Sequence, residues 1–293
     1  MKPKDSVIKI AVMADIHSNC VALEACIDKA LTEGVDQFIF LGDYLGEMAY
    51  PKKTLAIIKE LQSRYPCTCI RGNKEEYWIN HRKNAHEIWE YGKTTTGILK
   101  YVYDHLTDQE IDLFENMPIA KDMKYDGLPA FTICHGSPVK VNQSMRPDYD
   151  YIDELLENIS AELILCGHFH IQTEDVRNRT RVINPGAVGV PLHSGGLGQF
   201  MILKGSEGLW KPQFYSVKYD VAEAIRQMEK ENLDQKAPGW FRMTRNLLTT
   251  GEKSVVTFIS EVQHAYLEET GISDYRLIPE EFWKKILDQI LIL

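Results

Sequence analysis

The side chains of this chain that could do chemistry recur where apolar runs end. They comprise two carboxylates, one carboxamide and four imidazoles: Asp15, His17, Asp43, Asn73, His135, His168 and His170. Oxygen and imidazole donors together suit Mn²⁺, Fe²⁺, Zn²⁺ or Co²⁺ better than a metal selected by thiolates. Seven such side chains exceed the three or four protein ligands of one catalytic zinc. They suffice for two ions if one carboxylate is shared, so the pattern predicts a two-metal site.

The elements that must position these side chains are predicted β-strands. The run Val7–Ala14 reads as a buried strand that ends at Asp15, and the segment from Asn19 to Gly34 reads as an amphipathic helix with Asn19 as its N-cap. Four further apolar runs end at the other side chains: 37–41, 67–70, 130–134 and 163–166. Ligands of open α/β sheets bind at the carboxyl ends of the strands. We therefore expect the seven side chains to converge at one edge of the fold.

Three strand–loop–helix units in succession, the third helix beginning near Lys74, predict a parallel layer with crossover helices, one of them over 54–64. Segment 74–117 then reads as a helical insertion rich in aromatic residues: Tyr77, Trp78, Trp89, Tyr91, Tyr101, Tyr103 and Phe114. We expect these aromatics to form a small core of the insertion. The alternative is that some of them line a pocket above the site. Further strands are predicted at 181–183, 199–203 and 212–217.

From residue 221 the pattern becomes helical. A helix over 221–231 follows Asp220 as its predicted N-cap, one or two helices are predicted in 244–270, and a last helix spans 279–293. One stripe of the last helix is apolar: Phe282, Ile286, Ile290 and Leu293. It is expected to pack on the body of the protein or on a second subunit, which would make a homodimer. We divide the chain into a main domain, 1–220, and a helical C-terminal subdomain, 221–293.

Composition narrows the range of partners. With 33 Lys and Arg against 42 Asp and Glu, the net charge is −9, which argues against binding to duplex nucleic acid or anionic lipid. A small anionic substrate held by a metal is still allowed. No apolar run approaches the roughly 18 residues of a membrane span, and residues 1–5 lack the apolar stretch of a signal peptide. The six cysteines are expected to be reduced thiols, so we expect a cytoplasmic protein.

An ordered series of motifs resembles that of the calcineurin-like metallophosphoesterases: Asp15-x-His17, Gly42-Asp43, Gly72-Asn73, His135-Gly136 and Gly167-His168-x-His170. The resemblance covers about residues 8–190 and implies a four-layer α/β/β/α sandwich. The order of motifs and the sequel Asn184-Pro185-Gly186 resemble the small bacterial and archaeal phosphodiesterase branch. The overall length and the helical tail are similar to those of proteins described as asymmetric diadenosine tetraphosphate hydrolases.

The resemblance also implies a role for each side chain. It assigns the first ion to Asp15, His17 and His170, the second to Asn73, His135 and His168, and the bridging position to Asp43. Mn²⁺ is the expected metal, with Fe, Zn, Co or Ni as alternatives. The ions would activate a bridging hydroxide that attacks phosphorus in line. Asn73 would also contact a phosphate oxygen, and Asn19 could do so from the first loop.

Lys74 departs from the family pattern, because many members have a proton-donating histidine there. A lysine is cationic at neutral pH, so Lys74 could bind the substrate and stabilise the charge of a phosphate, but it is a poor proton donor unless its pKa is depressed. Help for the leaving group must then come from the metal, from a depressed Lys74 or from another residue, unless the substrate has a good leaving group. This favours phosphodiesters and nucleotide polyphosphates over sugar monophosphates. An alternative is that Lys74 is a solvated residue without a role.

Three functions are compatible with these patterns. We favour a two-metal phosphohydrolase acting on a diester or a dinucleoside polyphosphate. The second is a phosphomonoesterase acting on a protein or a small molecule. The third is a non-catalytic scaffold of the same fold, as in the retromer subunit, although scaffolds tend to lose the ligand set that is intact here. A nuclease for long DNA is disfavoured, since the acidic chain offers no basic track.

Overall fold

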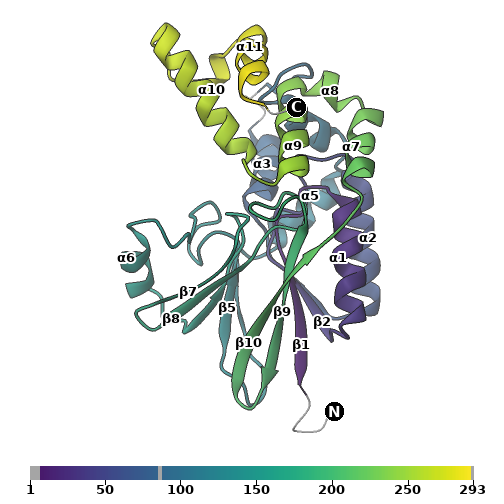
Figure 1. Ribbon diagram of the computed structural model, residues 1–293. Helices are drawn as coiled ribbons and strands as arrows, with labels where there is room; N and C mark the ends of the chain where they lie inside the picture. Colours follow the sequence, from purple (N-terminus) through teal and green to yellow (C-terminus); the bar gives the residue numbers. More distant parts are fainter. Residues whose placement is uncertain (1–6, 85–87, 292–293) are drawn as a thin grey trace.

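The structure, a computed structural model, describes residues 7–84 and 88–291 and contains two five-stranded sheets (Figure 1). The first sheet has the order β10 (Leu209–Val217), β9 (Gly198–Ser206), β1 (Ile8–Met13), β2 (Gln37–Phe40) and β3 (Cys67–Cys69). The second has the order β4 (Ala120–Met123), β5 (Phe131–Cys134), β6 (Leu163–Leu165), β8 (Thr180–Pro185) and β7 (Gln172–Arg177). The expectation for residues 1–5 lies outside the described residues.

Strand β1 is the centre of the first sheet. It pairs in parallel with β2, where Ile10 lies opposite Gln37, and antiparallel with β9, where Val12 lies opposite Met201. Its side chains alternate between two apolar cores, because successive residues of a strand point to opposite faces. Ile10 and Val12 join the core between the two sheets, whereas Ala11 and its neighbour two residues on join the core under the helices.

Helices cover the outer face of each sheet, which completes four layers. α1 (Cys20–Thr32) and α2 (Pro51–Arg64) pack on the first sheet, and α6 (Ile152–Glu157) packs on the second. The Asn19 side chain accepts a hydrogen bond from the Ala22 N–H and caps α1. The order α/β/β/α, expected from the resemblance, is thus confirmed, although the outer layer on the second sheet is one short helix with loops.

Leaving aside residues 85–87, which the structure does not describe, the predicted insertion contains three helices, α3 (Asn73–Lys83), α4 (Gly97–Asp104) and α5 (Asp108–Asn116). Its aromatics do not form a separate core. Trp78, Tyr101 and Phe114 are fully buried in the same cluster as the outer face of the first sheet and the C-terminal helices. The insertion therefore packs both against the first sheet and against the C-terminal helices.

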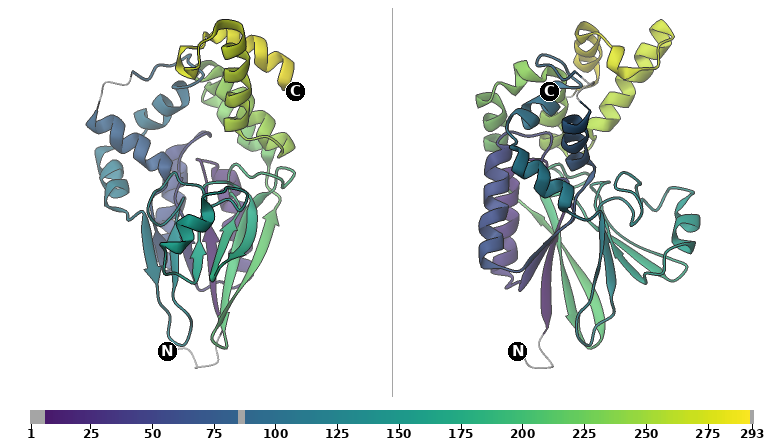
Figure 2. Two further views of the ribbon diagram at one scale, coloured as in Figure 1. Left: turned by 90° about the vertical axis from the view of Figure 1, so that its left-hand side faces the viewer. Right: turned by 180° about the vertical axis from the view of Figure 1, so that it is seen from behind.

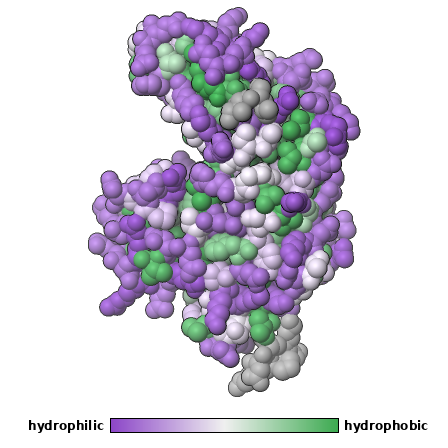
Figure 3. All heavy atoms as spheres, viewed as in Figure 1, coloured by the Kyte–Doolittle hydropathy of each residue, from purple (hydrophilic) through white to green (hydrophobic). Residues whose placement is uncertain are grey.

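The C-terminal helices form a layer above the sandwich (Figure 2), and we call α7 to α11 the helical cap. It consists of α7 (Val221–Lys230), α8 (Leu233–Lys236), α9 (Pro238–Thr250), α10 (Val255–Thr270), a 3₁₀ turn (Tyr275–Leu277) and α11 (Glu280–Ile290). Asp220 caps α7, as predicted. In space-filling view the molecule is deeply hollowed on one side, between α10 and the loops around α6 (Figure 3).

Helix α11 packs on the body of the chain. Phe282 and Ile286 are buried in the same cluster as α9 and α10, while Ile290 packs against it partly buried and Leu293 lies outside the described residues. The homodimer and the domain division at residue 220 stay predictions. Among the described residues, no helix combines the length and apolar character that crossing a membrane requires.

Candidate metal centre

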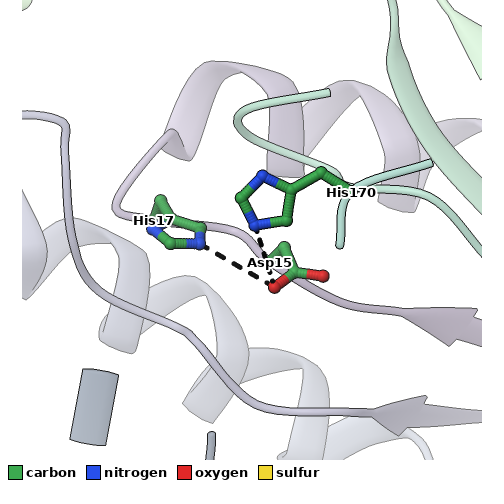
Figure 4. A group of neighbouring side chains, drawn as sticks. All are labelled: Asp15, His17 and His170. Carbon is green, nitrogen blue, oxygen red and sulfur yellow. Dashed lines mark ion pairs between the residues drawn. The ribbon is translucent and has the colours of Figure 1, made fainter. Parts of the chain in front are cut away.

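The carboxyl ends of β1, β2, β5 and β6 bring the seven predicted side chains together, with Asn73 at the start of α3. Around Asp15 lies a first group: its Oδ1 is 3.3 Å from His170 Nε2 and 3.8 Å from His17 Nε2 (Figure 4). Asp15 and His17 are buried and His170 is half-buried. The first group matches the set expected for the first ion.

A second group lies next to the first. Asn73 Oδ1 is 3.0 Å from His135 Nε2 and 2.9 Å from His168 Nδ1. Asp43 stands between the groups, because its Oδ1 is 3.4 Å from His135 Nε2 and its Oδ2 is 3.5 Å from His17 Nε2. This is the position from which one carboxylate can reach two ions.

The backbone that carries these side chains is strained. We call residues 15–17, 43, 73, 135 and 168–170 the ligand loops. Five of the seven predicted ligands have left-handed φ angles between 50° and 76°: Asp15, His17, Asp43, His168 and His170. Non-glycine residues adopt such angles at a cost of roughly 1–2 kcal/mol each. Strain of this kind persists where surrounding structure holds it and clusters at functional sites.

Backbone contacts hold the loops after β1 and β2 together. The Ile16 and His17 N–H groups both donate to the Asp43 carbonyl, at 2.9 and 3.1 Å. Gly42, with φ +93°, is needed where the second loop passes Gly72, because a Cβ there would collide with the Gly72 backbone. Gly42 therefore allows the two loops to approach each other closely.

Buried partners orient the ligands. His135 Nδ1 donates to the Leu41 carbonyl at 2.8 Å, which turns its Nε2 toward the site. Glu75 is fully buried and accepts three backbone hydrogen bonds, from the N–H groups of Gly72, Asp43 and Tyr44 at 2.7, 2.9 and 3.0 Å. It ties the loop after β2 to the start of α3. Burial, together with the Asp43 charge, raises the pKa of Glu75 to about 7.

The titration of the ligands reflects their crowding. Burial would raise the pKa of Asp15 and of Asp43, but the neighbouring imidazoles, chiefly His170 for Asp15 and His135 for Asp43, hold both values below their ordinary range. Burial opposes charge on His135, yet Asp43 raises its pKa to about 9. Burial and the charge of His135 lower the pKa of His168 to about 4.

The donor atoms of these residues suit a divalent cation. Asp15 Oδ1 and His17 Nε2 are buried and have no hydrogen-bond partner among the described residues. Neighbouring ligands of one ion bound at about 2.1 Å stand roughly 3–3.5 Å apart, close to the separations given above. Two sets of donor atoms are close enough to share an ion: Asp15 with His17 and His170, and Asp15 with Asp43 and His135. The donors are oxygen and imidazole nitrogen, which suits the expected metals.

Two further predicted residues have other partners. The Asn19 amide donates to the Gly189 carbonyl at 2.9 Å and lies 3.3 Å from the Tyr219 hydroxyl, so both ends of this side chain hold structure. The Lys74 ammonium contacts Glu47 at 2.9 Å. Burial would lower the pKa of Lys74, but Glu47 outweighs it and holds that pKa above its ordinary value. The structure therefore does not contain a Lys74 with a lowered pKa. Substrate contacts by Asn19 and Lys74 stay predictions.

Sequence reasoning missed Glu47 and Glu75. A glutamate three residues after a helix N-cap is a known signal, and Glu75 stands in that position after Gly72. Nothing in the local pattern distinguishes Glu47, whose partners come from residues 17 and 74.

Comparison with known proteins agrees with this geometry. Residues 8–208 match the family model described as the calcineurin-like phosphoesterase superfamily domain. The uncharacterized protein MJ0912 of Methanocaldococcus jannaschii is 24% identical over 243 residues, covering 77% of this chain and 94% of that protein. Two crystal structures share the fold and are covered completely by 84% of this chain. They are a metallophosphoesterase from Sphaerobacter thermophilus, with 20% identity and a TM-score of 0.66, and the hypothetical protein PH1004 from Pyrococcus horikoshii OT3, with 22% identity and a TM-score of 0.69.

Proposed function

This chain belongs to the calcineurin-like phosphoesterase superfamily, and we propose that within it the chain is a two-metal phosphohydrolase for phosphodiesters or nucleotide polyphosphates. Dinucleoside tetraphosphates are the polyphosphates we favour. One observation carries the proposal: the seven predicted metal ligands, from five separate loops, converge, and Asp15 Oδ1 and His17 Nε2 are buried without a hydrogen-bond partner in the part of the chain that the structure describes.

In this proposal Asp15, His17 and His170 hold the first ion. Asn73, His135 and His168 hold the second, and Asp43 contacts both. When bound, two divalent ions supply a Lewis acid for the phosphoryl oxygens and lower the pKa of a water molecule. The ligand loops contribute rigidity, because hydrogen bonds to Leu41 and Glu75 fix the orientation of His135 and of the Asp43 backbone.

The surroundings of Lys74 support a substrate with a good leaving group. Its side chain is 13% exposed and its ammonium is paired with a carboxylate, so it is held as a cation and is poorly suited to give a proton to an alkoxide. A phosphoanhydride or an aryl phosphate leaves with less protonation than an alkyl monoester does. We therefore place the monoesterase and the scaffold second to the diester or polyphosphate hydrolase.

The remaining expectations belong to the same proposal. Mn²⁺ is the metal we favour, with Fe, Zn, Co or Ni as alternatives, and the substrate is a small phosphorylated molecule. A cytoplasmic location is supported by the cysteines, all six of which are free. A homodimer stays part of the proposal without a specific contact to support it.

The test is hydrolysis of bis-p-nitrophenyl phosphate by chelator-stripped protein reloaded with Mn²⁺. We expect metal-dependent release, and we expect Asp43→Asn to lower it by more than about 100-fold, because even partners of metal ligands contribute about 10–100-fold. Asp122→Asn, on the exposed edge strand β4, is the matched control and should retain activity. Diadenosine tetraphosphate and p-nitrophenyl phosphate are then compared. Absence of metal-dependent release from all three substrates would refute the proposal, and faster monoester than diester hydrolysis would favour the monoesterase.

A further inference from the structure

Glu47 lies in the loop between β2 and α2 and contacts a predicted metal ligand from behind. Its side chain is 6% exposed, and its Oε2 contacts His17 Nδ1. The Nε2 atom of the same imidazole points to Asp15 and Asp43, at 3.8 and 3.5 Å. One imidazole therefore connects Glu47 to the centre of the site.

The loop that carries Glu47 is fitted to His17. The Met48 N–H donates to the His17 carbonyl at 3.1 Å, and the Gly46 N–H donates to the Ser18 hydroxyl at 3.2 Å. A Cβ on Gly46 would collide with the His17 ring. The contact between Glu47 and His17 is thus held by the backbone on both sides of it.

The second oxygen of Glu47 is bound to Lys74, whose Nζ lies 2.9 Å from Oε1. Two aromatic rings flank this ammonium: the ring of Tyr77 at 5.7 Å and the ring of Trp240, from α9 of the cap, at 5.5 Å. Trp240 is only 9% exposed. The lysine is thus a fixed cation with partners from three parts of the chain, and it contacts Glu47 directly.

We infer that Glu47 is the positioning residue for His17, and that Lys74 holds Glu47 in place and balances its charge. An ionised carboxylate only accepts hydrogen bonds, so the His17 nitrogen that faces it must carry the proton. That leaves the Nε2 lone pair for a cation, and carboxylates behind ligating imidazoles set ring orientation and basicity in this way. The inference rests on the proposed function, since it concerns a ligand of the proposed first ion.

The arrangement also gives Lys74 a role different from the two that the sequence suggests. A proton donor or a phosphate contact needs an ammonium free to turn toward the substrate. Here one carboxylate oxygen and two rings occupy its surroundings. Substitution of Lys74 should therefore act through Glu47 and His17 rather than through substrate binding.

The test measures Mn²⁺ binding to chelator-stripped full-length protein by isothermal titration calorimetry, so it does not depend on activity. Glu47→Gln keeps the size of the side chain and should weaken one of the two ions by about 10–100-fold. Because this variant leaves Lys74 unpaired and could unfold, the double variant Glu47→Gln/Lys74→Met is measured beside it, with circular dichroism for folding. Glu231→Gln, which changes a carboxylate at the end of α7 in the cap that accepts from the Tyr101 hydroxyl of α4, is the matched control.

The outcomes separate the alternatives. Weakened binding of one ion in both the single and the double variant, with Glu231→Gln unchanged, supports the inference. Wild-type affinity in the double variant would show that Glu47 serves only to neutralise Lys74 and would overturn it. A higher KM in Lys74→Met, with Mn²⁺ affinity unchanged in every variant, would overturn it in favour of a substrate contact. If the wild-type protein binds no Mn²⁺, the proposed function itself fails, and this inference fails with it.

Discussion

The helical cap and the ligand loops use left-handed backbone angles in different ways. In the cap, α9 and α10 end at Gly251 and Gly271, which adopt φ of 69° and 75° without a steric cost, and Asn232 before α8 adopts φ of 55°. In the ligand loops the same angles are adopted by aspartate and histidine. The N-terminus of α10 is capped in the usual way, because the Ser254 side chain accepts a hydrogen bond from the Thr257 N–H.

The difference shows which property each region serves. Cap residues provide hydrogen-bond partners for the backbone groups at helix ends and bury apolar surface, so they contribute stability. The ligand loops place donor atoms close together in strained backbone conformations, so they contribute metal binding, and their backbone angles carry a cost in stability. Three predictions test this division, beginning with the largest expected effect.

The largest effect on stability is expected in the cap. Trp283 of α11 is 1% exposed and belongs to the cluster that joins the cap to the first sheet. Trp283→Ala should lower the free energy of unfolding by about 3–5 kcal/mol, the usual cost of removing a buried aromatic side chain. Chemical denaturation of the metal-free protein measures this loss. Truncation of the exposed Leu277 to Ala is the control and should have little effect; equal losses in both would show that the cap contributes no specific core.

The second prediction concerns pH and the ligand loops. The Glu47 carboxylate outweighs burial and raises the pKa of His17 to about 10, and that of His135 is raised to about 9, both above the 6.5 of an unfolded histidine. Their contribution to stability is complete below pH 6.5 and is lost as the pH rises toward 9–10. The metal-free protein should therefore be less stable at pH 8.5 than at pH 6.5, by a few kcal/mol, since one pKa unit corresponds to about 1.4 kcal/mol.

Metal reverses this trend, because ligation needs neutral imidazoles and releases their protons. Mn²⁺ binding at pH 7.5 should release about two protons, which calorimetry in buffers of different ionisation enthalpy measures. Trp283→Ala should keep the pH slope of the metal-free protein at a lower overall stability. His135→Asn should reduce the slope. A slope unchanged in His135→Asn would contradict the assignment of this dependence to the ligand loops.

The smallest effect isolates the backbone strain. His170 has φ +59°, so His170→Gly and His170→Ala remove the same ligand, but only alanine keeps the strain. Both should lose Mn²⁺ affinity. The metal-free glycine variant should be about 1 kcal/mol more stable than the alanine variant, although glycine ordinarily destabilises a folded chain. Thermal unfolding of the two variants measures the difference, and alanine equal to or better than glycine would show that residue 170 carries no strain.

The sequence predicts the ligand loops better than their surroundings. Asp15, Asp43 and His135 each follow an apolar run, and parallel strands bring such positions to one edge of a sheet, so convergence follows from local patterns. Glu47 could not be predicted in the same way, because its partners depend on how one loop folds over another. The resemblance to a family supplied the pairing of ligands with ions, which no periodicity contains.

The elements that were not predicted from the sequence are two edge strands and two short helices. β4 and β7 are the edge strands of the second sheet, and the polar sequence of β7 (Gln172–Arg177) has no buried residue to mark an apolar face. α6 and α8 are each less than two turns long, too short for an apolar stripe to repeat along the helix. The aromatics of α3 to α5 were expected to pack among themselves. Some do, as Trp78 and Trp89 show, but the buried aromatics also belong to the cluster that contains the first sheet and the C-terminal helices. Those contacts are too distant in sequence for local patterns to show.

The position of β1 has a consequence for how the protein is made. During synthesis on the ribosome the chain emerges from its N-terminus, and the last predicted ligand, His170, appears before β9 does. β1 then has β2 on one side and an unpaired edge on the other until residues 198–206 arrive. We expect a nascent chain that ends at residue 170 to carry every predicted ligand and still lack the sheet that holds Asp15 and His17 in place. All predicted ligands are thus synthesised before the sheet that positions Asp15 and His17 can form.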